Sequence, residues 1–215
     1  IVGGYAVLAG ALELVWGIRH RGRSALARDA IVIGSGNRAV AEALGTPGNW
    51  PFRTAILHGP PRSGKSLFAR WFAAHQSAGV IDGVQTLAET EIFHRWNRAQ
   101  EDGFPLLLVV DGEAWEIALP DLRSRMGAAL QLEIGPPDDA LATDLMLSHA
   151  AQRGLALGEG APAYLVPRME RSYAAIEKIV AEIDRLSLER QVPATLSVWR
   201  DALDAVQGPD QGRLL

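Results

Sequence analysis

The sequence predicts an α/β fold in which helices flank a parallel sheet, followed by a small all-helical domain at its C-terminal end. Three observations support this prediction. A phosphate-binding motif at residues 59–66 stands between a short apolar run and a helical pattern. Residues 106–110 are continuously apolar, which is typical of a strand that is buried on both faces of a parallel sheet. Beyond residue 135 the apolar residues recur only at helical spacing.

The composition excludes several classes of protein. Of the 215 residues, 48% are hydrophobic, which is enough for a buried core and argues against a disordered chain. The net charge of −4 disfavours a domain that grips duplex DNA by itself, because such domains are usually basic. The sequence has no cysteine, which excludes disulfides and cysteine-based zinc sites and suits a reducing compartment. We therefore expect a cytoplasmic protein.

The phosphate-binding motif is a complete match to G-x-x-x-x-G-K-[ST]. It comprises Gly59, Pro60, Pro61, Arg62, Ser63, Gly64, Lys65 and Ser66. A strand over residues 54–58 precedes it and a helix over 65–76 follows it, so backbone N–H groups and the helix N-terminus favour a bound phosphate. The expected ligand is ATP or ADP. We expect Lys65 to reach the β-phosphate and, in ATP, the γ-phosphate, and the Ser66 hydroxyl to hold Mg²⁺. The alternative, a glycine-rich turn with an ordinary surface lysine, does not explain four fixed positions in this context.

Asp111 directly follows the apolar run at residues 106–110. The carboxyl end of a parallel strand lies at the edge of the sheet where ligands bind in open α/β folds. We therefore expect Asp111 to hold Mg²⁺, directly or through water. The alternative is an aspartate that only caps a helix.

Other apolar patterns complete the predicted elements. Strands are expected at residues 80–82 and 129–134, and an amphipathic helix at 88–100. Pro137 suits the first turn of the first helix of the C-terminal domain. The segments are then an N-terminal part of unclear role (1–29), an α/β core (30–135), a helical lid (136–207) and a tail (208–215).

The N-terminal residues 1–18 are apolar except for Glu13, and basic residues follow at 19–23. This length is at the lower limit for a membrane span. Four glycines and the central Glu13 favour a packed or partner-binding helix over a membrane anchor. Membrane contact by residues 1–18 is thus the less favoured alternative.

Taken together, five stretches resemble the DnaA-type AAA+ ATPases, and among them the Hda-type regulatory relatives of the DnaA initiator. These stretches are residues 31–37, the phosphate loop, the strand that ends in Asp111, residues 119–126 and residues 135–139. The resemblance covers residues 30 to about 206 and implies an AAA+ P-loop core with a helical lid.

One interval conflicts with this resemblance. AAA+ cores of this type place another strand between the phosphate-loop strand and the strand that ends in Asp111. A helix, a strand and two loops would need about 28 residues, yet the next motif begins within nine residues of Asp111. Because a central strand cannot be removed without unpairing its neighbours, we expect that a strand–helix segment near residues 112–118 is missing from the sequence.

The resemblance assigns further roles. Arg125 matches the arginine finger, which reaches the nucleotide of a neighbouring subunit; Arg123 could substitute, and the alternative is a surface arginine paired with Asp121. At the sensor 2 position the chain has Ala174, with Arg171 about one turn earlier. The nucleotide contacts implied outside the motif are Val32, Asn37, Leu67 and Arg171.

The implied function is regulation of chromosomal replication initiation, in which Arg125 stimulates ATP hydrolysis on DnaA in trans. The implied partners are DnaA and the DNA polymerase sliding clamp, although only residues 211–215 resemble a clamp-binding peptide, and a homo-oligomer is left open.

Gly112 follows Asp111 where many relatives carry a second acid, which is consistent with weak intrinsic hydrolysis. An alternative is a helicase-loader-like or transposition-helper ATPase that handles single-stranded DNA, but the net acidity argues against the basic groove that it needs.

Overall fold

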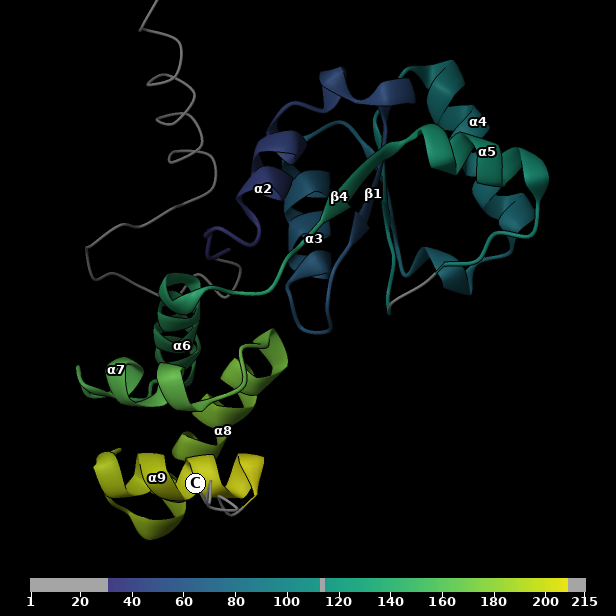
Figure 1. Cartoon of the computed structure of the whole chain (residues 1–215). Coiled ribbons are helices and arrows are strands. Elements are labelled where there is room, and N and C mark those ends of the chain that lie inside the picture. The colour runs from purple at the N-terminus through teal and green to yellow at the C-terminus, as the bar shows by residue number, and fades with distance from the viewer. Residues whose placement is uncertain (1–30, 113–114, 209–215) are drawn as a thin grey trace, which may run out of the picture. The chain divides into compact units, whose positions relative to one another are not determined.

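The computed structural model describes residues 31–112 and 115–208, which form two compact units (Figure 1). The first unit comprises Ser35–Gly135. The second contains the described residues from Pro136 onward together with residues 31–34. The predictions for residues 1–29 and 211–215 fall outside the described residues.

The first unit is built on a four-stranded parallel sheet with the order β2-β3-β1-β4. Its strands are β1 (Thr54–His58), β2 (Gly79–Asp82), β3 (Leu106–Val109) and β4 (Leu130–Glu133). β1 and β3 occupy the centre, which explains why both read as almost uninterrupted apolar runs. The predicted α/β fold with a parallel sheet is confirmed.

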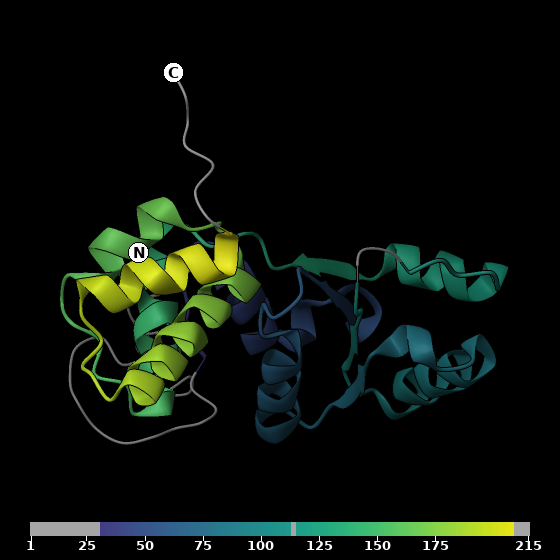
Figure 2. The ribbon, with the colours of Figure 1, turned by 90° about the horizontal axis from the view of Figure 1, so that it is seen from below.

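Helices cover both faces of this sheet (Figures 1 and 2). α2 (Arg38–Gly45) and α3 (Lys65–His75) lie on one face, and α4 (Glu89–Asp102) and α5 (Pro120–Ala128) lie on the other. Three 3₁₀ turns connect these elements: η1 (Pro47–Asn49), η2 (Pro51–Arg53) and η3 (Val84–Thr86).

Successive side chains of the central strands point to opposite faces of the sheet, so the strands contribute apolar residues to the core on each face. Ile56 and Leu108 pack with Ile92 and Trp96 of α4 and with Met126 of α5. The buried indole N–H of Trp96 donates a hydrogen bond to Thr54 Oγ1 at 3.1 Å, so this large side chain leaves no polar group unpaired. The sheet thereby holds α4 and α5 side by side.

Direct pairing of β1 with β3 contradicts the expected extra strand between them. The register runs from Thr54 opposite Leu106 to Leu57 opposite Val109. The Val110 N–H continues the ladder by donating to Leu57 O at 3.0 Å. These backbone groups therefore satisfy one another, and the pairing argument for a segment missing near residues 112–118 does not hold for this sheet.

The second unit is all-helical around one apolar core. Its elements are α6 (Asp139–Arg153), α7 (Ala161–Leu165), the 3₁₀ turn η4 (Val166–Arg168), α8 (Tyr173–Arg190) and α9 (Leu196–Gln207). Asp138 caps α6 by accepting a hydrogen bond from Leu141 N–H at 2.8 Å. The prediction that Pro137 lies in the first turn of this helix is therefore wrong, because Pro137 precedes the capping residue.

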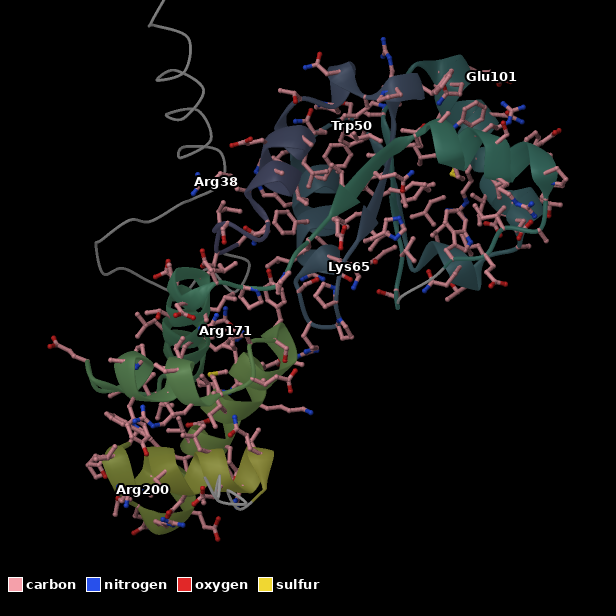
Figure 3. The ribbon with its side chains drawn as sticks, in the orientation of Figure 1. Arg38, Trp50, Lys65, Glu101, Arg171 and Arg200 are labelled. Atoms are coloured by element: carbon pink, nitrogen blue, oxygen red, sulfur yellow. The ribbon has the colours of Figure 1, made fainter. Side chains whose placement is uncertain are left out.

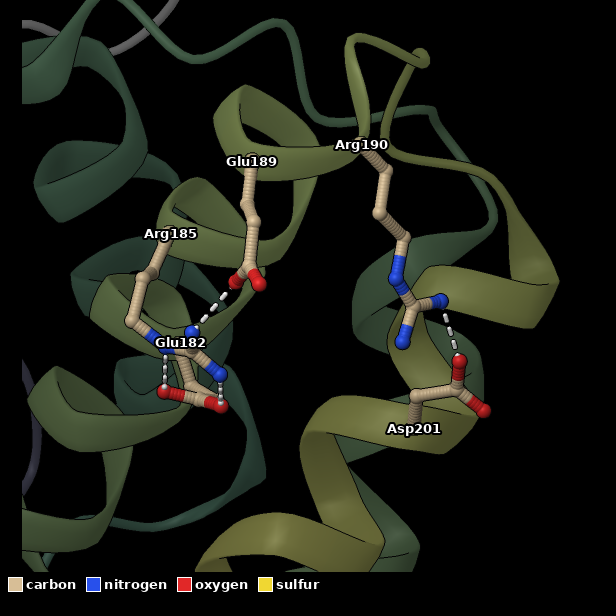
Figure 4. A network of polar contacts seen from close by, with 5 residues as sticks. All are labelled: Glu182, Arg185, Glu189, Arg190 and Asp201. Carbon is tan, nitrogen blue, oxygen red and sulfur yellow. Dashed lines mark hydrogen bonds and ion pairs between the residues drawn. The ribbon is translucent and has the colours of Figure 1, made fainter.

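Ion pairs lie on the surface of the lid helices α8 and α9 (Figure 4). Arg185 pairs with Glu182 at 2.7 Å and with Glu189 at 2.5 Å along α8, and Arg190 pairs with Asp201 of α9. Exposed pairs of this kind contribute little stability, so the apolar cluster that α6, α7, α8 and α9 share carries most of the packing. Within the described part of the chain, no helix combines the length and the apolar character needed to cross a membrane.

Candidate nucleotide site

The phosphate loop connects β1 to α3, and the sign of the backbone φ angle alternates between its successive residues 62, 63 and 64. Arg62 and Gly64 have positive φ values of 64° and 88°, whereas Ser63 between them does not. Such alternation directs successive N–H groups into a concavity that suits an anion. A Cβ at Gly59 would lie 2.9 Å from Ile134 Cβ, so only glycine fits where the loop leaves the sheet.

Lys65 is held inside this loop at the first position of α3 (Figure 3). Its side-chain Nζ donates to Gly59 O at 2.9 Å and to Pro60 O at 3.2 Å, and the residue is only 6% exposed. An ammonium group has three donors. The third N–H of Lys65 is available to a phosphate oxygen while the other two fix the position of the charge.

Ser63 provides an independent indication of a ligand. It is 5% exposed, and its Oγ makes no hydrogen bond with the described residues. The hydroxyl lies inside the loop, 3.1 Å from the position that a Cβ on Gly59 would occupy. A buried hydroxyl without a partner costs about 1–3 kcal/mol, which a phosphate oxygen could recover by accepting its proton. The loop therefore fits a phosphate group.

Asp111 reaches the same edge of the sheet. Leu57 is paired with Val109, so Gly59 and Asp111 each follow that pair by two residues. The Asp111 N–H donates to Gln85 Oε1 at 3.2 Å, and the Gln85 side-chain amide donates to Asp111 O. Gln85, which the sequence analysis missed, thus fixes the backbone that presents the exposed carboxylate.

A third segment joins this edge through β4. The Ile134 N–H donates to His58 O at 3.0 Å, and the Gly135 N–H donates to Gly36 O at 2.8 Å. Asn37 follows Gly36, is 3% exposed and stands immediately before α2. The structure therefore brings Asn37 to the same edge as the phosphate loop, whereas Val32 belongs to the second unit.

The lid and the core are both similar to known proteins. Residues 139–203 match the family model described as Hda, lid domain. The structure is similar to domain III of the Thermotoga maritima replication initiation protein DnaA, with a TM-score of 0.67 and 16% identity over 83% of this chain and 95% of that chain. Residues 139–203 are therefore similar to the lid of Hda, and the chain has the fold of DnaA domain III.

Two further solved structures share this fold. The AMPPCP-bound DnaA from Aquifex aeolicus matches with a TM-score of 0.58 and 17% identity, over 76% of this chain and 67% of that chain. The Thermotoga maritima RuvB Holliday junction branch migration motor matches with a TM-score of 0.54 and 14% identity, over 74% and 64% of the two chains. The family resemblance predicted from the sequence is thereby confirmed.

The two arginines of α5 make different contacts. Arg125 is half-buried, and its guanidinium lies over the aromatic rings of Phe93 and Trp96 on α4, at 4.8 Å and 4.4 Å from their centroids. Arg123 is exposed and donates to Ile117 O at 2.7 Å and to Ala118 O at 3.3 Å. Arg123 thus braces the loop before α5, whereas Arg125 packs on the neighbouring helix.

Glu89 organises the same loop and was not anticipated. Its carboxylate, in the first turn of α4, accepts hydrogen bonds from Ala118 N–H at 2.7 Å and from Leu119 N–H at 2.6 Å. These two donors hold the pKa of the Glu89 carboxyl below its ordinary value of 4.5. The start of α4 is therefore tied to the start of α5, on which Arg125 lies.

Arg171 lies in the lid, just before α8. Its guanidinium forms an ion pair with Asp139 at 3.0 Å, at the first position of α6. Both side chains are 61% exposed, so the pair is a surface contact that solvent screens. A role of Arg171 toward nucleotide remains a prediction from the family resemblance.

Proposed function

We propose that this Hda-like protein binds ATP or ADP with Mg²⁺ at the phosphate loop and stimulates ATP hydrolysis on DnaA through Arg125. The lid match and the similarity to DnaA support a DnaA-related AAA+ regulator of replication. Two observations in the phosphate loop carry the nucleotide-binding part: the buried Ser63 hydroxyl has no hydrogen-bond partner among the described residues, and the Lys65 ammonium is held by Gly59 O. The AMPPCP bound to the Aquifex aeolicus DnaA supports the same class of ligand.

Each residue of the proposed nucleotide site has a physical role. The N–H groups of the loop and the Lys65 ammonium bind the phosphates, and Gly59 and Gly64 permit the close approach. Ser66 and Asp111 offer a hydroxyl and a carboxylate, oxygen ligands that Mg²⁺ accepts in phosphate sites. When bound, Mg²⁺ would neutralise phosphate charge. Further proposed contacts are Asn37, Val32, Leu67 and Arg171.

Arg125 is the proposed arginine finger. A guanidinium that meets the γ-phosphate of ATP on DnaA stabilises the charge of the transferring phosphoryl group, and such residues raise rates by about 10³–10⁵-fold where they have been measured. The two rings on α4 limit the positions that the Arg125 side chain samples. The sliding clamp and a homo-oligomer remain predictions from the family resemblance.

Single-turnover hydrolysis of labelled ATP preloaded on DnaA, with clamp and DNA supplied, tests the finger. We expect Arg125→Ala to reduce the stimulated rate by at least ~100-fold while ADP affinity of the variant stays unchanged. Arg125→Lys is the matched variant, because it keeps a cation near the rings but loses the planar fork. Arg123→Ala is the neighbouring control. Equal stimulation by the wild type and Arg125→Ala would remove Arg125 from this role.

A further inference from the structure

Arg62 adopts a backbone conformation that its residue type rarely takes. Its φ is 64°, in the left-handed region where a Cβ crowds the backbone and where glycine is the usual residue. Four non-glycine residues with positive φ occur in the described chain: Phe52, Arg53, Arg62 and Gln191. Of these, Arg62 is the one inside the phosphate loop. A strained residue at a ligand loop suggests that its side chain contributes something that glycine could not.

The shape of the loop explains why position 62 must be left-handed. Arg62 and Gly64 alternate in hand with Ser63, which is the pattern that forms an anion-binding concavity. Gly64 meets the same requirement without a side chain. The loop therefore needs this backbone conformation at residue 62, but it does not need an arginine to achieve it.

What the arginine adds is charge at the rim of the anion site. Ser63 is buried and Lys65 is folded onto loop carbonyls, so both act within the loop, whereas Arg62 is exposed. A guanidinium stays protonated and donates parallel hydrogen bonds whose spacing matches two phosphate oxygens. Its long stem lets it reach a phosphate group that emerges from the loop.

We propose that Arg62 is a phosphate-binding residue at the rim of the loop, where its guanidinium contacts a terminal phosphate of the bound nucleoside di- or triphosphate. This inference rests on the nucleotide binding proposed above and adds, beside Lys65, a second cationic side chain of the same chain to that site. The gain in ligand affinity offsets the conformational cost at residue 62. No bond is made or broken in this step.

The proposal predicts effects of opposite sign for one substitution. Arg62→Gly should raise the urea midpoint of the nucleotide-free protein, because glycine adopts a φ of 64° without strain. The same variant should bind fluorescent ADP and AMPPCP about tenfold more weakly, because it lacks the guanidinium. Arg62→Asn is a second variant that tolerates left-handed backbone without charge, and it should lose affinity to the same extent.

Two controls separate this inference from the proposed function. Gln191→Gly relieves a similar strain in the lid, at a φ of 54°, and should raise stability without changing nucleotide affinity. Lys65→Ala tests the nucleotide site itself and should abolish binding. If Lys65→Ala abolishes binding while both Arg62 variants bind within twofold of the wild type, the role of Arg62 is wrong and the site stands. If the wild type binds neither nucleotide, the proposed function and this inference both fail.

Discussion

The Arg125 guanidinium lies 4.4 Å from the centroid of the Trp96 ring, and Phe93 lies close to the same cation at 4.8 Å. A cation near an aromatic face gains about 0.5–1 kcal/mol at an exposed site and more where water is excluded. Trp96 belongs to the apolar core and Phe93 packs at its margin. The proposed arginine finger, Arg125, therefore packs against rings whose positions are fixed by the apolar core of its own subunit.

Phe93→Leu tests whether this contact orients Arg125. Leucine keeps an apolar side chain at the margin of the core but removes one of the two rings. We expect stimulated hydrolysis on DnaA to fall about two- to fivefold, the equivalent of ~0.5–1 kcal/mol, because Arg125 then samples more positions. Affinity for ADP should not change, since α4 is not part of the phosphate loop.

A higher rate in Phe93→Leu would contradict the orienting role, because it would mean that the rings hold Arg125 away from DnaA. Arg125→Lys in the Phe93→Leu background is the matched control. If Phe93 acts through Arg125, the second substitution should show less than its single-variant effect.

Glu89 predicts a specific dependence of stability on pH. Its folded pKa lies below 4.5, because Ala118 N–H and Leu119 N–H donate to the ionised carboxylate. For a depressed pKa the stabilisation is present above the unfolded value and is lost as the pH falls through the folded one. The free-energy advantage of the wild type over Glu89→Gln should therefore be largest near neutral pH and shrink below about pH 4.5.

Urea unfolding of both proteins across this pH range measures the difference directly. Amide exchange provides a local readout, since Ala118 N–H and Leu119 N–H should exchange faster in Glu89→Gln at neutral pH. A stability difference that stays constant from neutral pH to well below the folded pKa would exclude the carboxylate as its source.

The sequence was informative where the chemistry is local. The motif at residues 59–66 required a strand before it and a helix after it, and β1 begins and ends at the expected Thr54 and His58. Asp111 could be placed at the ligand edge because a run of buried residues ends there. These conclusions needed only neighbouring residues and the geometry of a parallel sheet.

Contacts between residues that are far apart in the sequence could not be predicted from a local pattern. The bonds from Ala118 and Leu119 to Glu89 span 29 and 30 residues, and an acid in a first helical turn is ordinarily explained by the helix dipole. The rings beneath Arg125 come from another helix, so neither the finger interpretation nor its alternative, a surface arginine paired with Asp121, included this contact. The pairing of β1 with β3 likewise depends on which strands meet, which the spacing after Asp111 did not reveal.

Gly59→Ala should destabilise the core and distort the phosphate loop together. The added Cβ would lie 2.9 Å from Ile134 Cβ and 3.4 Å from Ile134 O, and neither the strand end nor its backbone can move cheaply. Overpacking of this kind typically costs about 1–3 kcal/mol, which chemical denaturation measures. Gly127→Ala is the matched control, because a Cβ there meets nothing within 4 Å and its position in α5 favours alanine. Equal stability of the two variants would contradict the close approach at Gly59.

Ser63→Ala should separate the stability of the loop from its function. The Ser63 hydroxyl is buried without a hydrogen-bond partner among the described residues, so its removal should leave the nucleotide-free protein as stable as the wild type or up to ~1 kcal/mol more stable. Nucleotide affinity should fall about three- to tenfold, because the phosphate loses one donor in a water-poor loop. Urea unfolding without ligand and titration with fluorescent ADP measure the two effects on one preparation. A loss of stability with unchanged affinity would show that the hydroxyl serves the loop structure and does not face the phosphate.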